Sequence, residues 1–262
     1  MLRILGNMNN GYNEICNTDH LHQDMLMDVG VQVLDDGQTF ELFEEAKEAA
    51  LLLLSGKVTM SWDNQRAQAE RRSLFDENPT VLHVPKSAKV SVTADGGGAE
   101  LLIQKTVNAK TFTPKLYNPS DIATDILGEN VWNDTAKRLI RTVFDYTNAP
   151  YSNMVLGEVI NFPGRWSSYI PHGHEQPEVY FYRFDKDSGF GAAFIGDDAY
   201  KIRHNSALII PGGPTHPQAS APGYAMYYCW MIRHLDNNPW TARVNDERFT
   251  WLLEKDVSIW PD

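Results

Sequence analysis

The chain has 262 residues, of which 42% are hydrophobic and 22% charged, values typical of a globular protein that exclude a disordered chain. Its longest apolar run, around 49–54, is far short of the roughly 18 residues that a membrane span needs, so we expect no membrane partner. The N-terminus does not resemble a secretion signal, and two cysteines are too few for a disulfide framework, so we expect a cytoplasmic protein. The net charge of −11 and the lack of a Lys/Arg cluster argue against nucleic acid, so an anionic ligand would need local cations or a metal.

Glycine and proline separate short apolar stretches along the whole chain, a pattern typical of an all-β protein. The segment 40–54 is ambiguous, because its Glu, Ala, Lys and Leu residues favour helix. Ser120 could cap a short helix over 121–127, and 133–143 has a weaker helical pattern. The clearest predicted strands lie in the second half, at 153–162, 178–184, 207–210 and 224–232.

The two halves of the chain resemble each other weakly. VLHVP at 81–85 is similar to ALIIP at 207–211, an offset of 126 residues that also brings 51–54 near 178–181. This repeat predicts a first β-unit over 1–115, a linker over 116–150 and a second β-unit over 151–262. It also predicts that 51–54 is a buried strand, because tertiary context overrides helix propensity.

One group of residues in the second half has the composition of a metal site. His172 and His174 are two apart, so both rings face one side of an extended segment. Glu178 begins the next predicted strand, and His216 follows an apolar strand and a Pro-Gly-Gly turn. Three imidazoles and a carboxylate are suitable ligands for a divalent transition metal, and four protein ligands leave one or two positions for water or substrate.

The other histidines lack this context. His20 and His22 form a second H-x-H pair in NTDHLHQD, but this pair lacks the context of the first, so we expect a solvated segment there. We expect His83, His204 and His234 to be structural.

The metal motif resembles that of the cupins, H-x-H-x(3,4)-E followed later by His. Residues 153–240 are similar, more closely, to the double-cupin family of 5-deoxy-glucuronate isomerases and 5-keto-4-deoxyuronate isomerases. The matching stretches are LGEVINFPGRWSSYIPHGH, PEVYFYRF and IIPGGPTHPQASAPGY. The resemblance implies an all-β bicupin of two double-stranded β-helix (jelly-roll) barrels with few short helices, in which only the second barrel binds metal.

The family's metal ligands fall on the four residues of the motif, His172, His174, Glu178 and His216. The resemblance therefore implies one divalent metal per chain, zinc first, with manganese, iron, nickel and cobalt as alternatives. Shifted back by 126 residues, the same positions offer one carboxylate among apolar side chains and predict no metal in the first barrel: Ala46, Glu48, Leu52 and Val90.

The family's reaction implies a metal-dependent aldose–ketose isomerase with a small acidic sugar as its partner. GRWSSYIPH at 164–172 favours conversion of 5-deoxy-glucuronate to 5-dehydro-2-deoxy-gluconate in inositol catabolism. The short join between the His pair and Glu178 favours 5-keto-4-deoxyuronate isomerisation in pectin catabolism. Another cupin metalloenzyme, such as an iron dioxygenase, and a sugar-binding cupin stay open, and a homo-oligomer is compatible with the sequence.

Isomerisation moves a proton between neighbouring carbons and needs a general base close to the substrate. The candidates are Tyr180 and Tyr182, which share the parity of Glu178, Glu158, which interrupts an apolar strand, and Glu175 on the turn. The substrate carboxylate needs a cation, and Arg165, next to Trp166, is the nearest to the motif with a suitable position. We therefore predict Arg165 and Trp166 as substrate-binding residues.

Overall fold

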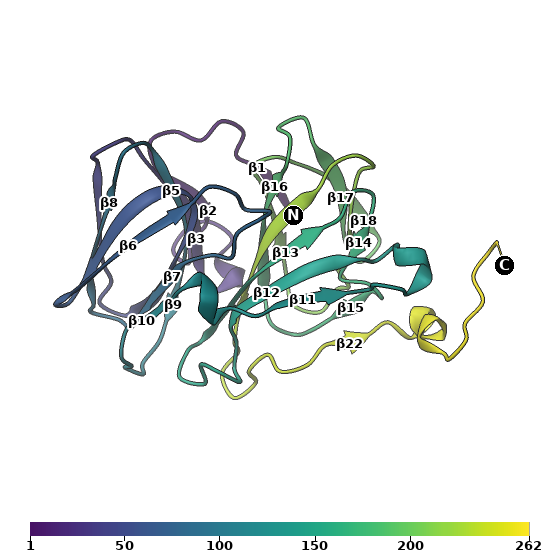
Figure 1. Ribbon diagram of the computed structural model, residues 1–262. Coiled ribbons are helices and arrows are strands. Elements are labelled where there is room, and N and C mark those ends of the chain that lie inside the picture. The colour runs from purple at the N-terminus through teal and green to yellow at the C-terminus, as the bar shows by residue number, and fades with distance from the viewer. Residues whose placement is uncertain (262) are drawn as a thin grey trace.

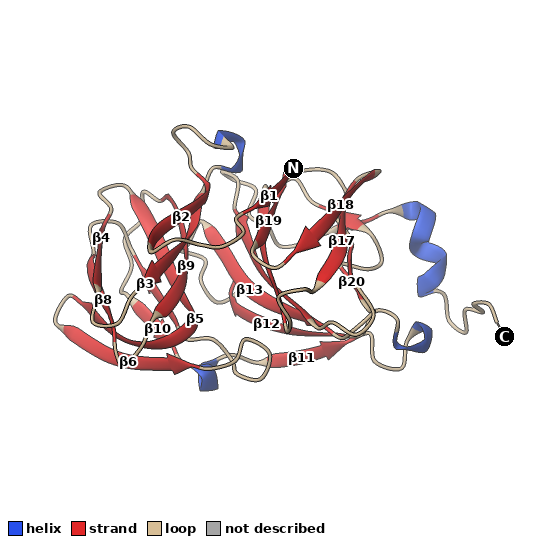
Figure 2. Ribbon diagram, turned by 90° about the horizontal axis from the view of Figure 1, so that it is seen from above, coloured by secondary structure: helices blue, strands red, loops and turns tan. Residues whose placement is uncertain are grey.

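Two β-barrels lie side by side in the computed structural model, which describes residues 1–261 (Figure 1). Nearly all regular structure in this range is strand (Figure 2), as the sequence predicts. No helix among these residues is long and apolar enough to span a membrane. The helices described are short 3₁₀ segments: η1 (Gln23–Met25), η2 (Pro119–Asp121), η3 (Trp132–Asp134) and η4 (Glu247–Leu253).

The first barrel is a single sheet that curls around an apolar interior. The long strand β5 (Lys47–Trp62) belongs to both layers, pairing with β7 and β9 through its first part and with β6 and β8 through its second. The other strands are β2 (Gly11–Cys16), β3 (Asp28–Leu34), β4 (Thr39–Phe43), β6 (Gln65–Arg71), β7 (Val81–Val84), β8 (Lys89–Ala94), β9 (Ala99–Val107) and β10 (Lys115–Tyr117).

The second barrel packs a seven-stranded sheet against a four-stranded one. The larger sheet has the order β1 (Leu2–Ile4), β19 (Ser206–Ile210), β16 (Glu178–Phe184), β21 (Met226–Arg233), β13 (Met154–Asn161), β12 (Arg138–Phe144) and β11 (Thr124–Leu127). The smaller sheet has the order β14 (Trp166–Ser167), β20 (Gln218–Ser220), β17 (Phe190–Ile195) and β18 (Asp198–Arg203). A two-stranded ribbon pairs β15 (His172–Gly173) with β22 (Val244–Asn245).

The two large sheets repeat one strand order, which agrees with the internal repeat. The order β10-β7-β5-β9-β3-β2 in the first barrel corresponds to β1-β19-β16-β21-β13-β12 in the second. The sheets differ from the predicted boundaries in two places. Strand β1, from the start of the chain, pairs with β19, and the predicted linker 116–150 contains β11 and β12 of the second sheet.

Two helix predictions are wrong, and both fail for one reason. Segments 121–127 and 133–143 contain only one-turn 3₁₀ helices, followed by strands β11 and β12 that pair with each other and extend the sheet beyond β13. Pairing in the sheet provides hydrogen-bond partners for the backbone of these segments, and this tertiary effect outweighs their local helix propensity. By contrast, 51–54 is a buried strand as predicted, with its leucines covered on both faces.

The barrels meet through the outer faces of their large sheets, and this contact fixes which side chains face inward. Leu52 and Leu54 of β5 belong to the same apolar cluster as Val179 and Phe181 of β16. Because side chains alternate along a strand, the other face of β16 points into the second barrel. The inward-facing side chains there include Glu178, which begins that strand.

Candidate metal centre

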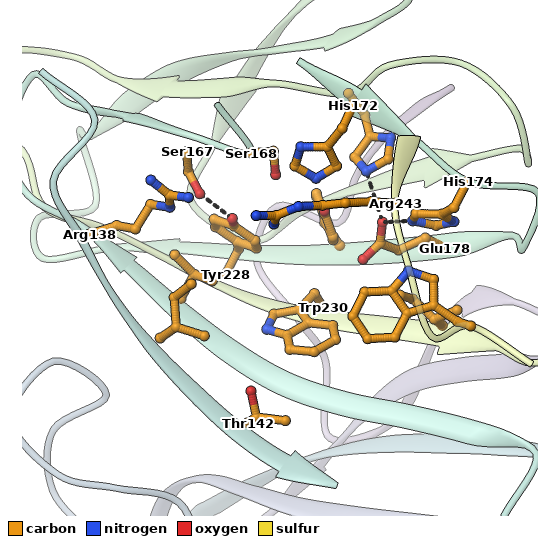
Figure 3. Close-up of a pocket in the computed structure, with 16 residues that line it drawn as sticks. Arg138, Thr142, Ser167, Ser168, His172, His174, Glu178, Tyr228, Trp230 and Arg243 are labelled. Carbon is orange, nitrogen blue, oxygen red and sulfur yellow. Dashed lines mark hydrogen bonds and ion pairs between the residues drawn. The ribbon is translucent and has the colours of Figure 1, made fainter. Parts of the chain in front are cut away.

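Three side chains from separate parts of the second barrel converge at one end of its interior, and Figure 3 shows two of them, His174 and Glu178, directed toward each other. His174 directly follows β15, Glu178 is the first residue of β16, and His216 lies between β19 and β20. The Nε2 atoms of His174 and His216 lie 3.3 and 3.2 Å from Glu178 Oε2. All three residues are buried, and their potential ligand atoms lie within 4.8 Å of one another.

The fourth predicted ligand, His172, lies beside this cluster. Its ring centroid is 5.5 Å from that of His216, and it lines the same pocket. The structure thus groups His174, Glu178 and His216 tightly and places His172 next to them. Metal binding by these residues stays a prediction of this arrangement.

Glycines allow the two ligand-bearing segments to pack closely. A Cβ at Gly173, between the two histidines, would overlap the carbonyl oxygen of Gly213. A Cβ at Gly212 would overlap the carbonyl oxygen of Glu175. Because both overlaps involve backbone atoms, only glycine lets the turn before His216 lie against the His pair.

The tautomers of the histidines fit a bound cation. Each Nδ1 lies at hydrogen-bond distance from a backbone carbonyl oxygen two residues away: His172 from Ile170 at 2.9 Å, His174 from Gln176 at 2.9 Å and His216 from Pro214 at 3.0 Å. A carbonyl oxygen only accepts, so Nδ1 carries the proton and a neutral ring presents the Nε2 lone pair. Two such lone pairs facing a carboxylate repel unless a positive charge lies between them. The donor set therefore fits a divalent metal.

Electrostatics keep Glu178 ionised and His172 neutral, the protonation states that metal ligands need. Burial alone would raise the pKa of Glu178, but when no cation separates the groups, N–H donation from His174 and His216 lowers it to about 2 and raises the pKa of His216. Burial, reinforced by the neighbouring His216 and Arg243, lowers the pKa of His172 to about 3. The carboxylate is thus ionised and this imidazole neutral at physiological pH.

A cavity of about 190 Å³ opens beside the cluster, which suits a small molecule. Its wall combines the predicted ligands with two phenols, two serines, two indoles and two arginines. The lining residues are Arg138, Ile140, Thr142, Val159, Ser167, Ser168, His172, His174, Glu178, Tyr180, His216, Tyr228, Trp230, Ile232, Trp240 and Arg243.

Of the predicted general bases, the structure brings only Tyr180 to this pocket. Tyr182 is buried behind it and donates to Gln218 Oε1 at 2.7 Å. Glu158 points from the opposite face of β13 toward the first barrel, where Arg71 and Arg141 bind it. Glu158 therefore lies on the wrong face of β13 to act as the base. The sequence could not show this, because β13 is covered on both faces and a single carboxylate in an apolar strand does not reveal which face it occupies.

The predicted substrate-binding residues lie outside the lining of this pocket. Trp166 stacks on Phe194 with ring centroids 5.7 Å apart, and Arg165 before it is half-buried. The cations that do line the pocket are Arg138 and Arg243. Neither is predicted from the sequence, because the segment of Arg138 has a helical pattern and no pattern marks the surroundings of Arg243.

The chain matches the model of one known protein family over most of its length. The model of the KduI/IolB family matches residues 5–252. This chain belongs to the KduI/IolB family. Members that resemble it include 5-deoxy-glucuronate isomerases from Geobacillus thermodenitrificans, 25% identical over 87% of this chain and 86% of that protein, and from Lacticaseibacillus casei, 27% identical over 80% and 84%. The family prediction is confirmed, and the chain is an aldose–ketose isomerase of this family.

Solved structures confirm the bicupin architecture. An IolB-like protein from Salmonella typhimurium superposes with a TM-score of 0.86 at 18% identity, covering 97% of this chain and 99% of the other. Oxalate decarboxylase from Bacillus subtilis superposes with a TM-score of 0.68 at 12% identity, covering 97% and 80%. At these identities the likeness shows the fold alone.

Proposed function

We propose that this KduI/IolB-family enzyme is a metal-dependent isomerase that converts 5-deoxy-glucuronate to 5-dehydro-2-deoxy-gluconate in inositol catabolism. The observation that carries the proposal is the His174–Glu178–His216 cluster in a small-molecule pocket. Relatives named 5-deoxy-glucuronate isomerase, similar over most of this chain, supply the sugar. A cytoplasmic location belongs to the proposal, and the scarcity of cysteines supports it.

His174, Glu178 and His216 would hold the metal, with His172 as the fourth ligand, and zinc is our first choice. A divalent ion there would supply Lewis-acid stabilisation of negative charge on the sugar's oxygens. The Nδ1 hydrogen bonds of the histidines fix each ring, so that Nε2 stays directed at the site.

Tyr180 is the proton carrier that the geometry favours. It lines the pocket, and its ring centroid is 6.0 Å from that of His216. Burial raises the pKa of its hydroxyl well above the usual value, so the group carries its proton at physiological pH. Tyr180 therefore suits donation of a proton to a sugar oxygen during the exchange of carbonyl and hydroxyl.

Trp230 and Trp240 cover the same cavity and reduce its contact with water. Their ring centroids lie 5.8 Å apart, and Trp240 also approaches His174. Exclusion of water strengthens the electrostatic interactions that the pocket makes with a polar sugar.

Metal analysis combined with an NMR assay tests the proposal. The purified enzyme should contain one divalent ion per chain and convert 5-deoxy-glucuronate without oxygen. Chelation should abolish turnover, and zinc or manganese should restore it. Turnover of a 4-deoxy-5-keto-uronate instead would identify the other substrate, which the short join between His174 and Glu178 favours. Activity that requires both oxygen and ferrous iron would overturn the isomerase mechanism.

A further inference from the structure

Two arginines line the pocket without an acidic partner. Arg138 is only 5% exposed, and its Nη1 donates to the carbonyl oxygen of Ala136 at 2.8 Å. Among the ion pairs of residues 1–261, none includes Arg138 or Arg243. By contrast, Arg141, also on β12 but directed to the other face of the sheet, pairs with Glu158. A buried guanidinium group normally has an anionic partner. Arg138 has no such partner in the protein, so a ligand can supply the missing negative charge.

Arg138 lies at the opposite end of the pocket from His174 and Glu178, whereas Arg243 starts on the metal-ligand side, near His172, and reaches across the pocket. Figure 3 shows Arg138 and Arg243 extending toward Tyr228, with Glu178 and His174 at the far side. The Tyr228 hydroxyl is hydrogen-bonded to Ser167 Oγ, so polar groups surround this end. A ligand that reaches both ends would place an anionic group at the arginines and its other oxygens at the ligand cluster.

Arg243 is held over the pocket by a segment tied to the ligand strand. Strand β22, which follows it directly, pairs with β15, so that Val244 lies opposite Gly173 and Asn245 opposite His172. Upstream, Gln176 Nε2 donates to the carbonyl oxygen of Asn238 at 2.9 Å. These contacts fix the distance between the Arg243 backbone and the metal-ligand residues.

We propose that Arg138 and Arg243 form a carboxylate clamp that selects monocarboxylate sugars and orients their carbonyl end toward His174, Glu178 and His216. A planar guanidinium group can donate two parallel hydrogen bonds to a carboxylate. Two such groups from separate segments would hold the carboxylate in one orientation and compensate its charge. The identity of the preferred sugar rests on the proposed function. The recognition of a carboxylate does not, because it rests on the two unpaired cations.

Calorimetric titration of the metal-loaded protein with D-glucuronate and D-glucose tests the clamp without requiring turnover. The wild type should bind glucuronate more tightly than glucose. Arg138→Gln and Arg243→Gln should each weaken glucuronate binding by about tenfold or more, because each removes a charge-assisted hydrogen bond. Arg138→Gln removes the charge but keeps a polar side chain, and circular dichroism checks that the fold survives the loss of the hydrogen bond to Ala136; exposed Arg243 contributes little to the fold. Arg203→Gln, on exposed β18, is the matched control and should bind like the wild type.

The kinetics of 5-deoxy-glucuronate turnover give a second measurement. Both glutamine variants should raise KM with a smaller change in kcat, because the carboxylate is bound alike before and during the reaction. Wild-type affinity in both variants, loss of binding in Arg165→Gln instead, or tighter binding of D-glucose 6-phosphate than of glucuronate would overturn the clamp. Arginine-dependent glucuronate binding in an enzyme that turns over no sugar acid would support the clamp and contradict the proposed function.

Discussion

Replacing Glu158 with glutamine separates a structural role from a catalytic one. Glu158 is fully buried and accepts from Arg71 Nη1 and Nη2 at 2.7 and 2.8 Å, from Arg141 Nη1 at 3.3 Å and from the Tyr227 hydroxyl at 2.8 Å. Arg71 ends β6 of the first barrel, whereas the other three residues belong to the second. The carboxylate therefore supplies the single negative charge that two buried guanidinium groups share at the junction of the barrels.

The expected cost of Glu158→Gln follows from those contacts. The substitution removes the negative charge and points an amide N–H₂ at a guanidinium, leaving Arg71 and Arg141 buried without compensation. Breaking a buried ion pair from one side costs about 3–5 kcal/mol. For a chain of this size 1 kcal/mol corresponds to about 2–4 °C in Tm, so we expect a decrease of roughly 6–20 °C.

Catalysis should be nearly unaffected by the same change. Glu158 faces away from the pocket, so kcat per folded molecule at a temperature well below the new Tm should stay within a few-fold of the wild type. Thermal unfolding and NMR turnover on one preparation decide the matter. Glu41→Gln, on exposed β4, is the control and should change stability by less than about 0.5 kcal/mol. A Glu158→Gln protein with wild-type Tm and a kcat reduced a hundredfold would refute this reasoning and restore Glu158 as a base.

Three further experiments, two of them with a control variant, test the site and its surroundings. His174→Ala should keep the β-sheet circular dichroism but lose metal and most activity, whereas His20→Ala, in the other H-x-H pair, should lose neither; elemental analysis distinguishes them. Tyr180→Phe should lower kcat by about 10²–10⁴-fold, while Tyr182→Phe should mainly cost about 1 kcal/mol of stability for its lost hydrogen bond, and an equal loss of kcat in both would contradict the proton role. Burial, with Arg233 nearby, lowers the pKa of His234 from 6.5 to about 4, so its contribution to stability is complete above 6.5 and is lost as the pH falls toward 4. His234→Gln should flatten that part of the stability–pH curve measured by denaturant unfolding, and an unchanged curve would show that other groups cause it.

His172, His174 and Glu178 could be predicted because their signal is local, whereas His216 follows from its place after an apolar strand and a Pro-Gly-Gly turn. His172 and His174 share one side of an extended segment, and Glu178 begins a strand that the apolar pattern predicts. Period-two alternation then places Tyr180 on the ligand side of β16. Each of these inferences needs only the neighbouring few residues, and tertiary contacts do not reverse them.

The substrate end of the pocket could not be predicted in this way. Arg138 reaches it because β12 pairs with β13 in a register that places Arg138 opposite Asn161. That register depends on the whole sheet and has no local signature. Arg165 is close to the motif in sequence but lies outside the pocket, because closeness in sequence says little about closeness in space.

The contrast between the two barrels shows how one fold supports two roles. The inward positions of β5 hold Ala49, Leu51 and Leu53, which fill the first barrel with apolar side chains. The polar residue next to them, Glu48, turns toward the other face and binds His83 there at 2.9 Å. The corresponding strand of the second barrel, β16, turns Glu178 inward, and its Val179 and Phe181 pack on the first barrel. The first barrel therefore acts as the second layer of the sheet that carries the pocket, and removing it would expose the apolar face that holds β16 in place.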